Sequence, residues 1–410
     1  MVKKIYSRKG EMIEGSMGYG WGKVILLGEH FVVHGMQALV AALPMKTVAT
    51  IKKSNKSSSY FLDQRPKVPH FKPTKTDKYQ MLLENILLFL SIKEPVEVIL
   101  EGDLLVTSGG IGASGATAVA LVRALNQAFC LALSDEKIHD AALVGERVVH
   151  GNPSGIDTTA AMSGGVFLFQ KNKKKIVSSC QSEYIPSDAK HCTEGYISSD
   201  TLRMSSGSTP HCTEGLLSKL NYFSPLYSLF VIPDLIRDLS PYPYAELTSR
   251  HCWGRSPSKQ SNSGSSHFFK QSISLASSLD LVLVDSGKVS DTKTVIAQVN
   301  DLKIQKPHVM DEVFKRYENL VSHAYQALTR DDLKTFGQCM NDNHTLLQEI
   351  GVSSPELDHM ATTARQAGAW GAKLTGTGQG GLLVALTPGK KLQDDVASSF
   401  QKQGYFVIKT

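Results

Sequence analysis

The sequence predicts a mixed α and β protein with two domains and a long irregular insertion between them. The chain has 410 residues, which is enough for two domains. Strand-like and helical patterns of apolar residues alternate towards both ends of the chain. Between residues 173 and 272 this patterning stops, and Ser, Thr, Gly and Pro dominate. We therefore expect an N-terminal domain at 1–172, a poorly ordered insertion at 173–272 and a C-terminal domain at 273–410.

The N-terminal segments alternate in type and lead into a loop that is rich in turn residues. In order, they are an extended run with a turn at Gly28 (22–35), two short strands or a hairpin (96–108), two helices (113–133 and 134–150) and a buried strand (164–170). Ser134 or Asp135 is the expected N-cap of the second helix.

The C-terminal segments repeat the alternation of strands and helices. They are a strand, loop and helix start (277–299), two long helices (306–330 and 331–351), a shorter helix (354–368), a glycine-rich strand region (372–386), a helix near 390–403 and a closing strand (405–410).

Composition favours an ordinary globular protein. Apolar residues make up 41% and charged residues 20% of the chain, and the net charge is only +6. The densest basic run, at 171–175, is interpreted as a solvated loop. No stretch approaches the roughly 18 apolar residues that span a membrane, and residues 1–15 lack the apolar core of a signal peptide. We expect a cytoplasmic protein that binds neither nucleic acid nor a membrane.

The cysteines do not indicate a disulfide scaffold or a zinc site. Six cysteines are few for a chain of this length, and Cys130 and Cys339 fall in helical patterns, where small core residues are expected. Three His-Cys pairs, at 191–192, 211–212 and 251–252, lie in the insertion. Adjacent residues of an extended chain point to opposite faces, and the Cys-x-x-Cys spacing of structural zinc sites is missing.

The sequence GIGASG at 110–115 matches a phosphate-binding pattern at the start of a helix. A dinucleotide site requires an acid that closes the next strand, but Asp135 begins a helix. No Gly-Lys-Ser/Thr follows, which excludes a Walker A loop. A phosphate cradle of another type remains, beside the plain alternative of a glycine-rich turn. Ser114 would supply a hydroxyl for Mg²⁺ or phosphate, and Glu146 is a candidate carboxylate nearby.

The segment HGNPSGIDTTAAMSGG, at 150–165, places one carboxylate, Asp157, directly after a cluster of turn residues. It is either an ordinary loop or a rigid turn that aims Asp157 at a reacting group.

Four segments together resemble the motifs of the GHMP small-molecule kinases, and two of them resemble the mevalonate kinase branch in particular. In order they are GKVILLGEHFVVHG, GGIGASGATAVAL, GERVVHGNPSGID and KLTGTGQGG. The resemblance covers residues 20–170 and 276–410. It implies an α+β fold with an N-terminal domain like ribosomal protein S5 and a C-terminal ferredoxin-like domain. It also implies transfer of phosphate from ATP to the 5-hydroxyl of mevalonate, giving 5-phosphomevalonate and ADP in isoprenoid precursor synthesis.

The resemblance also implies residue roles. Asp157 matches the catalytic aspartate and Lys23 the lysine beside it, while Glu29 and His30 match the substrate side of the first motif. The expected ATP-binding residues are Ser108, Gly109, Gly110, Ile111, Gly112, Ala113, Ser114, Gly376 and Gly378. Ser114 and Glu146 match the protein ligands of Mg²⁺, which would accompany ATP as the co-substrate. Taken alone, Lys23 could be a surface lysine, His30 a structural histidine and Glu146 half of an ion pair with Arg147.

Three departures from the family pattern accompany these matches. Gly20-Trp21 stands where Ala-Pro is usual, the second motif reads GIGASG in place of GLGSSA, and Gln379 replaces a glycine of the third motif. The alternative functions are another GHMP kinase, acting on phosphomevalonate or a sugar, and a catalytically impaired binding protein with the same fold. An NAD-binding oxidoreductase is not expected, because the sequence lacks the second half of a Rossmann fold. A homodimer is compatible with the sequence.

Overall fold

The computed structural model describes residues 12–67, 76–105, 110–151, 153–171, 268–288 and 292–410, all within one compact unit that comprises residues 1–176 and 264–410. A second unit, Val177–Ser263, lies outside the described residues. The predicted insertion, 173–272, therefore lies outside the described residues except for 268–272, and its poor order stays a prediction.

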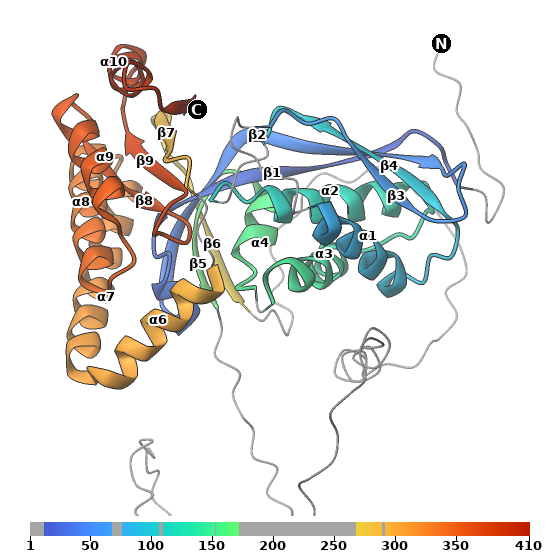
Figure 1. Cartoon of the computed structure of the whole chain (residues 1–410), viewed down its shortest axis with the longest axis horizontal. Helices are drawn as coiled ribbons and strands as arrows, with labels where there is room; N and C mark the ends of the chain where they lie inside the picture. Colours follow the sequence, from blue (N-terminus) through green and yellow to red (C-terminus); the bar gives the residue numbers. More distant parts are fainter. Residues whose placement is uncertain (1–11, 68–75, 106–109, 152, 172–267, 289–291) are drawn as a thin grey trace, which may run out of the picture. The chain divides into compact units, whose positions relative to one another are not determined.

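The first half of the unit is built around a six-stranded sheet (Figure 1). Its strands are β1 (Ser16–Leu27), β2 (Gln37–Lys53), β3 (Tyr60–Asp63), β4 (Val96–Gly102), β5 (Val166–Lys171) and β6 (Phe268–Ile273). The order is β3-β4-β2-β5-β6, with β1 paired to β2, and only β3 and β4 pair in parallel.

Four helices lie on one side of this sheet (Figure 1). They are α1 (Thr76–Phe89), α2 (Ala113–Ala128), α3 (Asp135–His150) and α4 (Ile156–Ser163). Helix α2 packs directly on β1, where Gly18, Gly20 and Gly22 alternate with larger residues. A Cβ atom at Gly20 would lie 2.9 Å from the Cα atom of Ala116. Glycines on this face of the strand therefore let the helix backbone approach closely.

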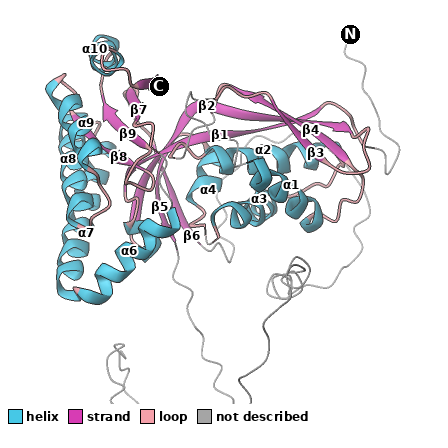
Figure 2. Ribbon diagram, viewed as in Figure 1, coloured by secondary structure: helices cyan, strands magenta, loops and turns pink. Residues whose placement is uncertain are grey.

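The second half of the unit has a four-stranded antiparallel sheet in the order β10-β7-β9-β8 (Figure 2). The strands are β7 (Leu281–Asp285), β8 (Gly371–Thr375), β9 (Leu382–Leu386) and β10 (Phe406–Lys409). The helices are α6 (Thr292–Gln305), α7 (Pro307–Thr329), α8 (Leu333–Glu349), α9 (Pro355–Gln366) and α10 (Lys390–Gln401). Helices α8 and α9 pack on β8, and α10 packs on β10.

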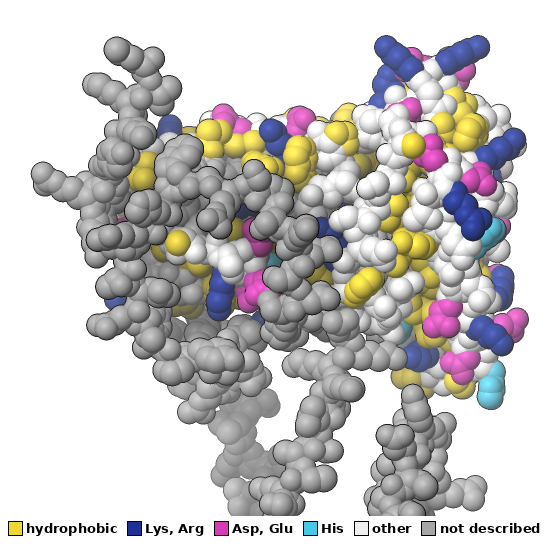
Figure 3. Space-filling view, turned by 180° about the vertical axis from the view of Figure 1, so that it is seen from behind, with side chains coloured by type: hydrophobic (Ala, Val, Ile, Leu, Met, Phe, Trp, Pro, Cys, Tyr) yellow, Lys and Arg dark blue, Asp and Glu magenta, His cyan; other side chains and the backbone are white. Residues whose placement is uncertain are grey.

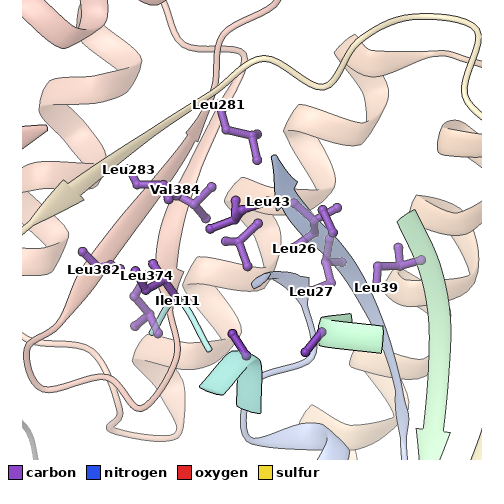
Figure 4. Close-up of a cluster of buried hydrophobic side chains, with 14 of the residues drawn as sticks. Leu26, Leu27, Leu39, Leu43, Ile111, Leu281, Leu283, Leu374, Leu382 and Val384 are labelled. Atoms are coloured by element: carbon purple, nitrogen blue, oxygen red, sulfur yellow. The ribbon is translucent and has the colours of Figure 1, made fainter. Parts of the chain in front are cut away.

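One hydrophobic cluster joins the two sheets. Leu26 and Leu39 of the first sheet belong to the same cluster as Leu374, Leu382 and Val384 of the second (Figure 4). Burial of such side chains contributes about 1.5–3 kcal/mol each. On the surface seen in Figure 3, basic and acidic side chains are interspersed. Among the described residues, no helix is long and apolar enough to cross a membrane.

Several local predictions are confirmed and others are wrong. Ser134 is the N-cap of α3 and accepts a hydrogen bond from the Lys137 N–H. Residues 31–34 form a 3₁₀ helix between two turns with positive φ, where an extended run was predicted. Residues 268–272, assigned to the insertion, belong to strand β6, because they pair with β5 along its whole length. Cys130 is exposed and follows the end of α2, so it is not a core residue.

Candidate active site

The first glycine loop and strand β1 are bonded to each other at Lys23. The Lys23 N–H donates to the carbonyl of Ile111 over 2.9 Å, and the residue is only 5% exposed. Gly112, the N-cap of α2, has a φ of +68°, and a Cβ atom there would lie 2.7 Å from Cγ of Lys23. The glycine therefore satisfies both a left-handed backbone and the close passage of the lysine side chain.

The carboxylate of Asp157 faces this lysine across the start of α2. Asp157 lies in the first turn of α4, which begins after Gly155, a residue with a φ of +86°. Its Oδ1 atom is 3.2 Å from Nζ of Lys23. A Cβ atom at Gly115 would lie 2.8 Å from Cβ of Asp157, so the first turns of α2 and α4 touch. The turn-rich segment thus delivers Asp157 on a helix start beside the glycine loop.

Ser114 and Glu146 lie in the same cluster. The Ser114 hydroxyl donates a hydrogen bond to the Glu146 carboxylate, which is 1% exposed on α3. Burial, and after it the negative charge of Asp157, raise the pKa of Glu146 to about 8, although the Ser114 hydrogen bond and Lys23 act in the opposite direction. Two carboxylates and one lysine therefore share a largely buried space.

Glu29 and His30 follow β1 and contact the C-terminal half. Glu29 forms a fully buried ion pair with Lys373 of β8. Burial raises the pKa of Glu29, and Lys373 and Lys23 act to lower it. His30 donates from Nε2 to the Thr377 carbonyl over 2.6 Å, and burial lowers its pKa.

The third glycine motif meets the second. A Cβ atom at Gly376 would lie 3.0 Å from Cα of Gly110, so the two loops are in backbone contact. The Thr375 hydroxyl hydrogen-bonds the backbone of Ile25, which attaches the loop to β1. Gly378 has a φ of +82° and contacts the carbonyl of Val352.

Gln379 departs from the family pattern without filling this loop. Its φ is +52°, which a glycine would adopt at lower cost. The exposed side-chain amide donates to Gln298 over 2.7 Å and to the Gly351 carbonyl over 3.3 Å. It therefore contacts α6 and the end of α8.

Nearly all the predicted site residues lie in one region. The structure groups Lys23, Gly110, Ile111, Gly112, Ala113, Ser114, Glu146, Asp157 and Gly376 around the start of α2, with Glu29, His30 and Gly378 on the adjoining loops. Ser108 and Gly109 lie outside the described residues.

Sequence reasoning missed Lys373 and Tyr317. Lys373 stands in a strand whose five residues are all buried, and it begins the motif KLTGTGQGG, so its place in that motif and a lysine in an apolar run were the available signals. Tyr317 of α7 stacks on Phe31 with ring centroids 3.9 Å apart and donates its hydroxyl to the Gln37 carbonyl. Nothing in the helical pattern around Tyr317 marks it out.

This arrangement suits transfer of a phosphoryl group. The N-terminal turn of α2 has no acidic residue, and the first backbone N–H groups of a helix have no carbonyl partner within the helix, which favours binding of an anion. Lys23 offers a positive charge there, and Asp157 offers a carboxylate that can accept a proton.

Comparison with known proteins agrees with this geometry. Residues 79–165 match the GHMP kinases N terminal domain, and residues 324–405 match the GHMP kinases C terminal domain. A mevalonate kinase of Aeropyrum pernix is 24% identical over 375 residues, covering 89% of this chain and 86% of that protein. The mevalonate kinase of Pyrococcus horikoshii is 26% identical over 407 residues, covering 93% and 91%.

Solved structures give the same result. The crystal structure of L. major mevalonate kinase in complex with R-mevalonate has a TM-score of 0.70 and 27% identity, covering 98% of this chain and 97% of that one. The Methanococcus jannaschii mevalonate kinase has a TM-score of 0.60 at 16% identity, covering 96% and 97%, which supports the fold. The predicted fold class is confirmed. The chain is therefore a member of the GHMP kinase family, an ATP-dependent kinase that carries both domains of that fold.

Proposed function

We propose that this kinase transfers the γ-phosphoryl group of ATP to the 5-hydroxyl of mevalonate, giving 5-phosphomevalonate and ADP. The observation that carries the proposal is the Lys23–Asp157 pair, 3.2 Å apart, at the start of the helix that follows the glycine loop. The names of the relatives support mevalonate as the acceptor, and so does the L. major structure, which contains R-mevalonate.

In this proposal the two glycine loops hold the phosphates of ATP. Gly110 and Gly112 have φ values of +95° and +68°, conformations that direct successive backbone N–H groups towards one side. Gly376, which directly follows β8, lies against the same loop, since a Cβ atom at Gly376 would meet Gly110. Positioning of this kind is the main contribution that a protein makes to phosphoryl transfer.

Asp157 accepts the proton of the attacking hydroxyl or orients that hydroxyl. It is half-buried, with 22% of the side chain exposed, so an acceptor can reach it. Lys23 holds the carboxylate in place and stabilises the negative charge that develops on the transferred group. General-base assistance of this kind contributes about 10²–10⁴-fold in rate.

The residues present fit a magnesium ion. Ser114 and Glu146 would supply oxygen ligands, which Mg²⁺ prefers, and the negative charge of Asp157 makes ionisation of Glu146 more costly. A divalent cation would relieve that repulsion. Among the described residues no group of three His, Cys, Asp or Glu could hold a metal alone, which suits an ion brought in with ATP. When bound, Mg²⁺ would neutralise charge on the phosphate oxygens.

Because ATP is a cytoplasmic metabolite, we place the enzyme in the cytoplasm.

The second candidate acceptor class comprises phosphomevalonate and sugars, since kinases for both share the fold. The similarity to those structures is 11% and 15% in identity, so it supports the fold alone.

The test is an acceptor panel. Purified protein is given Mg-ATP with mevalonate, phosphomevalonate, homoserine or galactose, and ADP release is followed. We expect turnover with mevalonate and none when Mg²⁺ is omitted. Turnover with a different acceptor would replace the proposed substrate. Absence of turnover with every acceptor, in a folded protein that binds ATP, would identify a binding protein in place of an enzyme.

A further inference from the structure

Lys373 begins the segment KLTGTGQGG, but the resemblance assigns it no role, and it is the most unusual residue near the site. It is 0% exposed and lies in β8, where all five residues are buried. Its Nζ atom donates to Oε1 of Glu29 and, over 2.6 Å, to the carbonyl of Leu374. A lysine is rarely buried completely unless it is paired, so Glu29 accounts for its burial.

The pair joins two parts of the site that are distant in the sequence. Glu29 directly follows strand β1, and Lys373 is three residues before Gly376, which contacts Gly110. Two further bonds join the same segments: Thr375 binds the backbone of Ile25, and His30 binds the carbonyl of Thr377. The buried ion pair and the bonds of Thr375 and His30 therefore together connect β1 and the residues after it to β8 and the third glycine motif.

The second carboxylate oxygen of Glu29 indicates the function of these contacts. Oε2 is buried and has no hydrogen-bond partner in the part of the chain that the structure describes. A buried carboxylate oxygen without a donor is costly, and a ligand hydroxyl would supply one. Lys23, which pairs with Asp157, is also close enough to Glu29 to favour its charged form. Glu29 therefore lies near the lysine that faces Asp157.

A purely structural role explains the pair poorly. Replacing a buried ion pair by well-packed apolar residues is often neutral or stabilising, so such a pair adds little to stability. The titratable groups facing Glu29 are Lys373 from β8, Lys23 from β1 and the phenol of Tyr317 from α7. Of these three groups, Lys373 donates a hydrogen bond to Glu29. Orientation of the Glu29 carboxylate therefore depends on Lys373.

We propose that Lys373 is a positioning residue for the phosphoryl acceptor: it fixes the Glu29 carboxylate so that Oε2 accepts a hydrogen bond from a hydroxyl of the bound alcohol. This role rests on the proposed function, because it requires an alcohol acceptor at that place. Lys373 touches neither acceptor nor nucleotide, and it acts through Glu29.

The test compares steady-state constants of the full-length enzyme and its variants. Lys373→Met should raise the KM for the acceptor about 10- to 100-fold, the range for loss of a hydrogen bond to a charged group. It should leave the KM for ATP within about twofold, because no contact with the phosphates is lost. Lys373→Arg should restore most of the acceptor affinity, since the charge returns. Lys409→Met is the matched control, because Lys409 pairs with Asp394 on the surface of the same sheet.

The double variant Glu29→Gln with Lys373→Met guards against misfolding, because it leaves no unpaired buried charge. It should fold and show the same acceptor KM as Glu29→Gln alone, since Lys373 acts only through Glu29. The role is overturned if Lys373→Met keeps the normal acceptor KM, if both KM values rise together, or if Lys373→Arg restores nothing.

The unmodified enzyme is assayed first, which separates this role from the proposed function. If another alcohol replaces mevalonate, the comparison is made with that alcohol. If no acceptor is turned over, the proposed function fails, and a crystal structure of Lys373→Met decides the positioning role. A displaced Glu29 carboxylate supports the role, and an unmoved one overturns it.

Discussion

Lys23 on strand β1 and Asp157 on helix α4 form an ion pair of 3.2 Å although 134 residues separate them in the sequence. The side chains are 6% and 22% exposed, so the aspartate is the more accessible member of the pair. Gly112 and Gly115, in the first turn of α2 or just before it, make room for these two residues. The glycine motif thus serves the ion pair as well as the phosphates.

The first prediction concerns the carboxylate. Asp157→Asn should lower kcat about 10²- to 10⁴-fold, because the amide cannot accept the hydroxyl proton. ATP binding should be nearly unchanged, since Asp157 is not part of the glycine loops. ADP release and equilibrium nucleotide binding measure the two effects. Asp301→Asn, an exposed carboxylate on α6, is the control. A variant that keeps more than a tenth of the activity would exclude proton acceptance by Asp157.

The second prediction concerns Gly112, where any side chain would meet Lys23. Gly112→Ala should displace the lysine and lower kcat about 100-fold, the cost of a misplacement of roughly 1 Å. Gly404→Ala is a matched control, because Gly404 has a similar φ of +84° but no atom within 4 Å of the added Cβ. Both variants bear about 1–2 kcal/mol of backbone strain, measured by urea unfolding. Equal kcat values in the two variants would contradict the proposed packing.

The third prediction concerns the pH dependence of stability. His344 of α8 accepts a hydrogen bond from the Leu374 N–H at Nδ1 and donates from Nε2 to Asp358. Burial lowers its pKa to about 4, with Asp358 opposing the shift. In the unfolded chain the pKa of this histidine is near 6.5, so as the pH falls the unfolded chain binds a proton before the folded chain does. Stability conferred by the neutral histidine is therefore present above pH 6.5 and is lost as the pH falls towards 4.

His344→Gln should remove this part of the pH dependence. The free energy of unfolding of the unmodified protein should fall by up to about 3 kcal/mol more than that of the variant between pH 6.5 and pH 4. His308→Gln, an exposed histidine on α7, should behave like the unmodified protein. Parallel curves for His344→Gln and the unmodified protein would show that His344 is protonated in the folded state.

The fourth prediction concerns the long segment between β5 and β6. Lys171 and Phe268 are register partners at the ends of these antiparallel strands. Their Cα atoms are therefore about 4.5–5.5 Å apart, a gap that a two-residue turn closes. Replacing residues 172–267 by Asn-Gly should leave kcat and both KM values within about twofold. Loss of folding or of turnover would show that the segment contributes to the enzyme.

Much of the site could be predicted because its chemistry is carried by short sequence patterns. Lys23, Ser114, Glu146 and Asp157 each stand in such a pattern, and the structure groups them. Local turn chemistry accounts for this: Gly112 and Gly155 take positive φ values at the starts of the two helices.

Other features depend on partners that the sequence does not place. Lys373 meets Glu29 across 344 residues, so its role appears only in the folded chain. Strand β6 was missed because Lys270, Gln271 and Ser272 of this edge strand are polar and exposed, so the strand lacks the apolar pattern of a buried one. The β-branched Val32 and Val33 suggested an extended run, yet the glycines at 28 and 35 close the chain into a 3₁₀ turn.

The most direct test of the proposed reaction is a crystal structure with Mg²⁺, a non-hydrolysable ATP analogue and mevalonate. We expect the terminal phosphate at the start of α2, next to Ser114, and the 5-hydroxyl within about 3.2 Å of the Asp157 carboxylate. A nucleotide bound away from the glycine loops, or a 5-hydroxyl turned away from Asp157, would contradict the assignment.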